Sequence, residues 1–210
     1  MMMKIKKEII DHSTEEKIKN AARKVFTQKG YAGTKTRDIA EEAGINLALL
    51  NYYFRSKEKL FDIIMLESFQ EFMRSMISVF NDEKTSLEKK IESMVSNYID
   101  LLIIQPDIPL FVLSELRNNP NELIKKMSLD NNLMKSFFMK QIQQAIKDEK
   151  ISDISPVHFF MNMMSLTVFP FVASPMLKNL GGLNQEEFDK LMQQRKKLIP
   201  KWIKAIMKVK

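Results

Sequence analysis

The scarcity of glycine and proline is the feature that most limits the folds open to this chain. Among 210 residues there are 5 glycines and 7 prolines. Sandwiches and barrels need many turns, and turns draw heavily on these two residues. Hydrophobic residues make up 45% of the chain and charged residues 28%, which is enough apolar material for a buried core. The sequence therefore predicts an all-α protein.

The positions of these residues divide the chain. Gly30, Gly33 and Gly44 lie close together near the N-terminus, whereas every proline lies after residue 105. We therefore expect a small N-terminal unit over residues 1–56 and a larger helical body over residues 57–210.

The N-terminal unit begins with a helix signal. Ser13 followed by Glu16 fits a capping box, with Ser13 as the N-cap. Apolar residues then recur at helical spacing as far as Gly30, which is a natural C-terminal stop.

Two short helices should follow, over residues 36–43 and 47–54. The turn between them contains Gly44, which can take the left-handed conformation, and Asn46, which can cap the second helix. This is a helix-turn-helix pattern. In such a motif the second helix enters the major groove of DNA by its N-terminal end.

The charge distribution is compatible with a nucleic-acid partner. The formal net charge is +7, and the first sixty residues hold 13 Lys/Arg against 8 Asp/Glu. Lys57 and Lys59 place positive charge at the positive end of the next helix dipole, and a docked phosphate would reverse that unfavourable arrangement. A solvated basic surface, with Lys57 offset by Glu58, is the alternative.

The body should consist of helices of normal to long length. An apolar stripe runs from Leu60 to Phe80 and predicts one long amphipathic helix. Pro200 should kink or divide the last helix. The remaining helices are expected over residues 85–104, 107–118, 121–148, 156–174 and 185–208.

The sequence lacks the residues that several classes of protein require. The chain has no cysteine and only two histidines, so the sequence predicts no metal site and no disulfide. It contains no Gly-rich phosphate loop and no Ser/His/Asp or Cys/His set. We therefore expect no catalytic residues, no cofactor and no enzyme activity.

One uncharged stretch, Pro156 to Leu177, is long enough to span a bilayer. It also contains His158 and Asn162 together with three prolines, which favours a core or dimer-interface helix. The N-terminus lacks the apolar region of a signal peptide. We expect a cytoplasmic protein with no membrane partner, and a membrane-associated interaction protein is a weak alternative.

Two segments of the N-terminal unit, TKTRDIAEEAGI from Thr34 and LNYYFRSKEKLF from Leu50, closely resemble the TetR/AcrR family of transcriptional regulators. The resemblance covers about residues 15–61. It implies a homodimer in which each subunit has a three-helix DNA-binding domain and a ligand-binding and dimerisation domain. It also implies a repressor that leaves a pseudo-palindromic operator on double-stranded DNA when a small molecule binds.

The resemblance assigns roles to individual residues. Leu50, Phe54 and Leu60 match apolar core positions. Lys35 stands where the family commonly has Ser or Thr, which leaves the helix cap to Thr34 or Thr36. The residues that the resemblance places on DNA, on the bases or on the phosphate backbone, are Thr36, Arg37, Leu47, Ala48, Leu49, Asn51, Tyr52, Tyr53 and Lys57.

Asn51 stands where many members of the family carry Tyr. An Asn side chain can bond adenine through two hydrogen bonds, while the apolar residues at 47–49 can offer only contacts to thymine methyl groups. The hypothesis that follows is an A·T-rich half-site, and a phosphate or surface role for Asn51 is the alternative.

The body is rich in side chains that repack easily, with 16 methionines and 14 phenylalanines in the chain. Such surfaces suit apolar ligands, although they also fill ordinary cores. We expect Phe69, Phe111, Phe137 and Met164 to contact a small apolar effector. The alternative is a packed body controlled by a protein partner. The resemblance also places dimerisation on the last two helices, residues 156–174 and 185–208.

Overall fold

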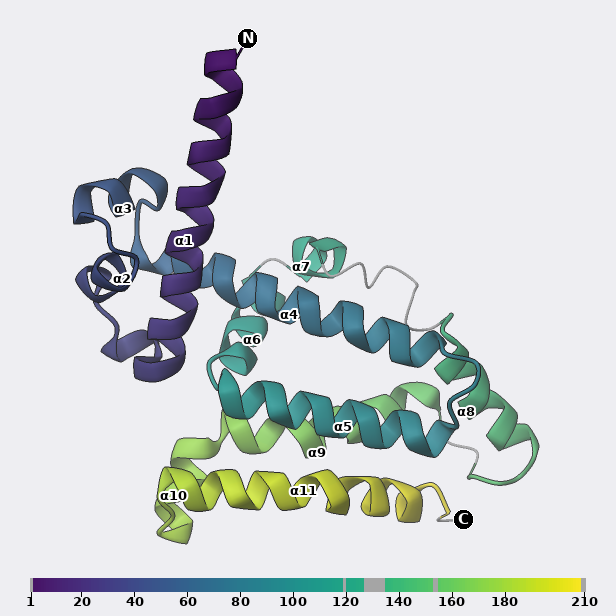
Figure 1. Cartoon of the computed structure of the whole chain (residues 1–210). Helices are drawn as coiled ribbons and strands as arrows, with labels where there is room; N and C mark the ends of the chain where they lie inside the picture. The colour runs from purple at the N-terminus through teal and green to yellow at the C-terminus, as the bar shows by residue number, and fades with distance from the viewer. Residues whose placement is uncertain (1, 119, 127–134, 153–154, 209–210) are drawn as a thin grey trace. The chain divides into compact units, whose positions relative to one another are not determined.

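The computed structural model describes the backbone of residues 2–118, 120–126, 135–152 and 155–208, and side chains from residue 13 onward. The described residues are helical with no strand, which confirms the expected all-α class (Figure 1). The helices in chain order are α1 Met2–Gly33, α2 Thr36–Glu42, α3 Leu47–Tyr53, α4 Lys57–Asn81, α5 Leu87–Ile104, α6 Ile108–Asn118, α7 Pro120–Lys126, α8 Phe137–Lys147, α9 Pro156–Val172, α10 Ser174–Gly181 and α11 Gln185–Ile206.

The chain forms two compact units, Met1–Phe69 and Gln70–Lys210, so the division falls inside α4. The sequence analysis placed it at residue 56, thirteen residues earlier. The first half of α4 is part of the N-terminal unit because its side chains bind α1. The ring of Phe61 packs edge-on against Phe26 of α1 at 5.1 Å between centroids. Glu67 accepts hydrogen bonds from Lys19 and Arg23 of α1.

The N-terminal unit packs α2 against α1 and α3 against α2 (Figure 1). Leu50, Phe54 and Leu60 are buried, as predicted. Each of the first four helices contributes to one apolar core. Its main members are Ile18, Ala22, Val25, Phe26, Ile39, Ala40, Leu50, Phe54, Leu60 and Ile64.

Helix α1 differs from its prediction at the start and agrees at the end. It extends back to Met2, so Ser13 lies inside the helix and the predicted capping box at Ser13 is wrong. A Ser with a Glu three residues later can also lie inside a helix when the residues before it are helical, so the capping-box pattern alone does not prove a helix start. At the other end Gly30 has φ 66° and ψ 172°, so regular helical geometry stops there as expected.

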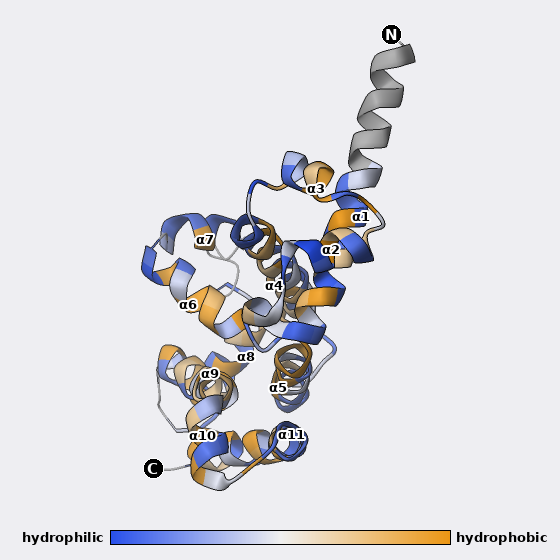
Figure 2. Ribbon diagram, turned by 90° about the vertical axis from the view of Figure 1, so that its left-hand side faces the viewer, coloured by the Kyte–Doolittle hydropathy of each residue, from blue (hydrophilic) through white to orange (hydrophobic). Residues whose placement is uncertain are grey.

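In the body, α5 lies beside both α9 and α11 (Figure 1). The side chains buried in these helices are mostly apolar, and α5, α9 and α11 each carry hydrophobic (orange) segments in Figure 2. Phe80, at the end of α4, stacks on Phe138 of α8 at 4.8 Å, which brings α8 into the same core. Buried members from α5, α8, α9 and α11 include Val95, Ile99, Leu102, Phe138, Met139, Ile142, Phe159, Met163, Phe188, Met192, Ile199 and Ile203.

The prediction of a single helix over residues 121–148 is wrong. The described residues form α7, which ends at Lys126, and α8, which begins at Phe137. Ser136 is the N-cap of α8, and its hydroxyl accepts a hydrogen bond from the Met139 amide at 3.4 Å. A capping hydroxyl stabilises a helix start, and apolar periodicity does not reveal it.

Pro170 and Pro200 both lie inside helices. Helix α11 continues through Pro200 as one helix, so the prolyl residue does not divide it. Helix α9 continues through Pro170 and ends at Val172. The extra helix α10, which the sequence analysis did not predict, begins at Ser174 with Pro175 in its first turn, a position where proline costs no hydrogen bond.

In the described part of the chain, no single helix is long and apolar enough to cross a membrane. Only α9 and α10 taken together meet that length and composition, and they are bent by 69° relative to each other.

Lys90 of α5 is fully buried, which is unusual for a lysine. Its ammonium donates to the Phe80 carbonyl at 3.0 Å and lies 4.7 Å from the centre of the Phe137 ring. Burial lowers the pKa of Lys90, while the nearby charges of Asp82 and Glu83 oppose that shift. The side chain therefore joins the last turn of α4 to α5 and α8.

We predict that Lys90→Ala lowers the free energy of unfolding by about 2–4 kcal/mol, because it opens a cavity and leaves a buried carbonyl without a donor. Lys89→Ala is the matched control. Lys89 is exposed and forms only an ion pair with Glu92, so its loss should change stability by about 0.5 kcal/mol or less. Urea denaturation measures both, and equal effects of the two variants would contradict the assigned role of Lys90.

Candidate nucleic-acid interface

The turn between α2 and α3 is closed by backbone bonds and a glycine. Gly44 has φ 61°, a left-handed conformation that other residues adopt at a cost. The Gly44 amide donates to the Glu41 carbonyl and the Ile45 amide to the Ala40 carbonyl, each at 3.0 Å. These bonds end α2 and turn the chain toward α3.

Asn46 then starts α3, as predicted. Its side-chain oxygen accepts a hydrogen bond from the Leu49 amide at 2.8 Å. Leu50 is buried on the inner side of this helix. The outer side of α3 is thereby fixed, because a helix of two turns with one buried position and one cap has little freedom to rotate.

The start of α2 is organised by an acidic residue. Lys35 occupies the N-cap position, so neither Thr34 nor Thr36 is the cap. The Lys35 amide donates to the Asp38 carboxylate at 3.0 Å, and Lys29 forms an ion pair with the same carboxylate at 3.1 Å. That amide, and then Lys29, hold the pKa of Asp38 below its usual value. Thr34 is buried and donates to the Gly30 carbonyl at 2.7 Å.

The residues that the sequence analysis placed on DNA lie on α2, on α3 and at the start of α4. Arg37 and Asn51 are exposed and form no hydrogen bond or ion pair within the described part of the chain. Tyr52 is 77% exposed, the highest value among the large hydrophobic side chains that project into solvent. Ala48 is exposed as well, and Thr36, Leu47, Leu49, Tyr53 and Lys57 are partly buried.

The two tyrosines of α3 support each other. Their rings meet edge to face at 88°, with 5.5 Å between centroids. This contact orients an exposed phenol beside a half-buried one at the C-terminal end of α3. Their roles on a DNA backbone stay predictions.

Lys57 has partners that the sequence did not reveal. Its ammonium donates to the carbonyls of Tyr31 and Thr34, at 2.9 and 3.0 Å, and lies 4.1 Å above the Tyr31 ring. Two of its three N–H groups therefore bind the last turn of α1 and the residue that follows it, and one is left for a phosphate. A lysine bridging these carbonyls fixes the start of α4 to the end of α1.

We predict that Lys57→Met lowers the free energy of unfolding by about 1–3 kcal/mol, because it removes two hydrogen bonds and leaves the Tyr31 carbonyl with only the long 3.4 Å bond from the Thr34 amide. Lys59→Met is the control, since Lys59 is exposed and forms no side-chain bond within the described residues. Differential scanning calorimetry measures both. Unchanged stability of Lys57→Met, together with a salt dependence of DNA binding that falls by about one ion, would instead assign Lys57 to a phosphate.

Sequence analysis missed two supporting residues. Tyr31 packs on Phe61 at 4.7 Å and carries Lys57 on its ring. Glu67 binds Lys19 and Arg23. Burial lowers the pKa of Lys19, but its bonds with Glu16 and then Glu67 outweigh that effect and raise it. The sequence does show aromatic residues at 26, 31 and 61, which could have pointed to Tyr31. Only the fold, however, reveals that these three side chains meet.

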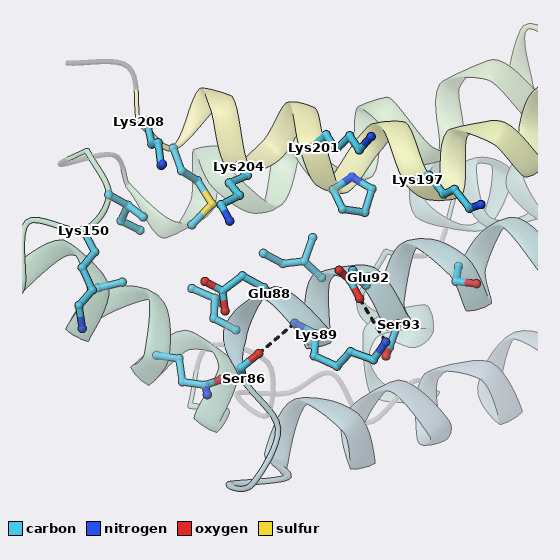
Figure 3. A pocket seen from close by; sticks show the side chains of 18 of the residues that line it. Ser86, Glu88, Lys89, Glu92, Ser93, Lys150, Lys197, Lys201, Lys204 and Lys208 are labelled. Carbon is cyan, nitrogen blue, oxygen red and sulfur yellow. Dashed lines mark hydrogen bonds and ion pairs between the residues drawn. The ribbon is translucent and has the colours of Figure 1, made fainter.

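The four residues expected to contact an effector have mixed environments. Phe69 and Phe111 are buried, and Phe137 and Met164 are half-buried. A pocket of about 1050 Å³ lies between α5, α8 and α11, and none of the four lines it (Figure 3). Their effector role stays a prediction. Among the described residues no cluster of three His, Asp or Glu side chains is placed to hold a metal ion.

Residues 18–64 match the family model described as "Bacterial regulatory proteins, tetR family". Among curated proteins, the chain is 23% identical over 199 residues to the probable HTH-type transcriptional regulator YttP of Bacillus subtilis, covering 93% of this chain and 95% of that one. It is 27% identical over 170 residues to the HTH-type transcriptional regulator RutR of Escherichia coli K12, covering 79% and 77%.

Solved structures agree on the fold. A transcriptional regulator of the TetR/AcrR family from Thermobifida fusca matches with a TM-score of 0.60 at 16% identity, covering 89% of this chain and 96% of that one. FadR from Bacillus subtilis, solved in complex with stearoyl-CoA, matches with a TM-score of 0.57 at 18% identity, covering 91% and 98%.

Proposed function

Since the chain belongs to the TetR family of bacterial regulatory proteins through its residues 18–64, we propose that it is a homodimeric repressor released from its operator by a small apolar ligand. The observation that carries the DNA-binding part is the outer face of α3. It presents Asn51 and Tyr52 to solvent on a helix whose inner face is packed and whose start is capped.

Base recognition in this proposal belongs to α3. Its N-terminal end enters the major groove, where Leu47, Ala48 and Leu49 meet thymine methyl groups. Asn51 bonds adenine through its amide, and its lack of a partner within the described chain leaves both amide groups available. Thr36, Arg37, Tyr52 and Tyr53 contact the backbone or the groove edge. Lys57 adds one N–H to a phosphate while it holds the domain together.

Dimerisation in this proposal uses α9 and α11. Val157, Met161 and Phe169 are exposed on α9 at intervals of four and eight residues, and all lie on one face. Leu198 and Trp202 are exposed one turn apart on α11, which packs beside α9. An apolar surface spread over two adjacent helices needs a cover, and a second copy provides one with two-fold symmetry.

The effector in this proposal acts through α4. That helix runs from Lys57 in the DNA-binding unit to Asn81 in the body. Lys90 binds its last turn and lies over Phe137, so an apolar ligand that moves Phe137 also disturbs the end of α4. The stearoyl-CoA of the similar FadR structure supports an effector with an acyl chain. Near-complete release requires the ligand to favour one state by about 5 kcal/mol.

A body controlled by a protein partner is the second candidate. Exposed leucines on α6 favour it, because Leu110, Leu113 and Leu116 project into solvent at spacings of three residues. Both candidates share the operator-binding step, which takes place on DNA in the cytoplasm, and neither requires catalysis.

We predict that Asn51→Ala weakens binding to an operator fragment about 5- to 150-fold, equivalent to 1–3 kcal/mol for one lost bidentate contact, and leaves binding to random duplex unchanged. Fluorescence anisotropy with DNA from upstream of the protein's own gene measures both at two salt concentrations. Asn121→Ala is the matched control, because Asn121 is exposed on α7 in the other unit. Equal weakening on both duplexes would place Asn51 on the phosphate backbone.

We predict that Leu198→Glu converts the dimer to a monomer, because it buries two carboxylates near the symmetry axis of the proposed interface. Asn121→Glu is the control, since it adds the same charge at a polar exposed position on α7, outside the proposed interface. Sedimentation velocity at micromolar concentration separates the two species. A dimer that persists in Leu198→Glu, with correct helix content, would place the interface elsewhere.

A further inference from the structure

Helix α11 carries a second exposed stripe, made of lysines. Lys197, Lys201 and Lys204 lie on one face of α11, and Lys208 follows four residues later in the turn after the helix ends at Ile206. All four are exposed, and none forms an ion pair or hydrogen bond through its side chain within the described residues. The stripe is about 16 Å long at 1.5 Å per residue.

The lysine stripe is separate from the other two faces of α11. At 3.6 residues per turn its centre lies about 120° around the helix axis from Leu198 and Trp202, the residues assigned to dimerisation. The buried positions, such as Ile199 and Ile203, lie in a third direction. Dimer formation therefore does not require the lysine stripe.

The stripe forms one rim of the 1050 Å³ pocket between α5, α8 and α11 (Figure 3). In Figure 3 Lys204 of α11 and Lys208, just after its end, lie beside the open space above α5, and Lys150, which follows α8, lies at its border. Ser152, next to the lining residue Ile151, donates to the carbonyl of the lining residue Met207 through both its amide and its hydroxyl, at 2.7 and 3.1 Å.

The pocket has an apolar part as well as a charged rim. Ile91 and Met207 are buried at its base. Leu87, Ala145, Ile151 and Pro200 extend this apolar lining. The pocket size matches those that hold small molecules, and mixed lining of this kind suits a ligand with one apolar and one charged end.

The charges of the pocket do not cancel. Lys89 pairs with Glu92, Lys150 with Asp148, and Lys196 with Asp100. The four lysines of the stripe then face one further lining carboxylate, Glu88. Like charges three and four residues apart destabilise a helix, and a bound polyanion would remove that repulsion.

We propose that this pocket binds a small molecule that carries a di- or triphosphate group beside a flat or apolar portion. The phosphates bind the lysine stripe, and the N-terminal turn of α5, which begins at Leu87, adds the positive end of a helix dipole. The apolar portion packs on Ile91 and Met207. The site is distinct from the residues expected to contact the apolar effector, so it gives the body a second input.

The test is isothermal titration calorimetry of the full chain with ADP, AMP, adenosine and inorganic pyrophosphate, without magnesium. We expect saturable binding of ADP, weaker binding of AMP and of pyrophosphate, and none of adenosine. A variant with all four stripe lysines changed to Gln should bind ADP at least about tenfold more weakly.

The matched control changes four other exposed lysines to Gln, namely Lys84, Lys125, Lys126 and Lys140, none of which lines the pocket. This control removes the same net charge and should bind ADP within about twofold of the wild type. Equal loss of ADP binding in the two variants, or pyrophosphate binding as tightly as ADP, would show that the stripe binds polyanions without selecting ADP. Either result would overturn the proposal. Absence of saturable ADP binding up to about 1 mM would also overturn it.

Operator binding is measured in parallel on both variants. The stripe lies in the body, so unchanged operator affinity in the stripe variant is expected even when ADP binding is lost. If the wild-type protein binds the operator but not ADP, this site alone is refuted. If it binds ADP but no operator, the repressor function alone is refuted.

Discussion

The burial of a few apolar side chains from α2 and α3 is the constraint on which the DNA-binding unit depends. Each of these helices has seven residues, well below the length at which an isolated helix is stable in water. Ile39 and Leu50 are almost completely buried and hold the two helices in the N-terminal core. The exposed residues of α3 keep a defined orientation only because this core exists.

Polar contacts fix the ends of the helices that this core holds. Asn46 sets the first turn of α3, and Asp38 sets the first turn of α2. Lys57 then binds carbonyls in the last turn of α1 and just after it, which fixes the point where α4 starts. A lysine that the sequence analysis assigned to a DNA phosphate is thus also a structural part of the unit that holds α3. The proposed phosphate contact would use the N–H group of the ammonium that these two carbonyls leave available.

The local parts of this fold were predictable from sequence, and the non-local parts were not. The turn at Gly44, the cap at Asn46 and the buried Leu50 follow from local chemistry and helical spacing. The start of α8 at Ser136, the burial of Lys90 and the second partner set of Lys57 depend on segments distant in sequence. The single helix expected over 121–148 was wrong because an apolar periodicity continues across a capping residue without marking it.

Helix α11 shows how one element can serve three surfaces. Ile199 and Ile203 pack into the body, Leu198 and Trp202 project toward the proposed second copy, and the lysine stripe borders the pocket. In the proposed mechanism, α11 would connect the pocket to the dimer interface, and the contact of Lys90 with Phe137 would connect α8 to the end of α4. Such connections are what a ligand-controlled repressor requires, since both states must differ in the placement of its reading helices.

The most direct test of the account is selection of duplexes from a random pool by the purified wild-type protein, followed by sequencing. The account predicts an enriched inverted repeat with A·T-rich half-sites, whose centres lie about one or two helical turns apart, as expected for two copies of α3 related by two-fold symmetry. Enrichment of G·C-rich half-sites would contradict the role of Asn51. No enrichment of any sequence by a folded dimer would contradict the central claim that α3 reads DNA.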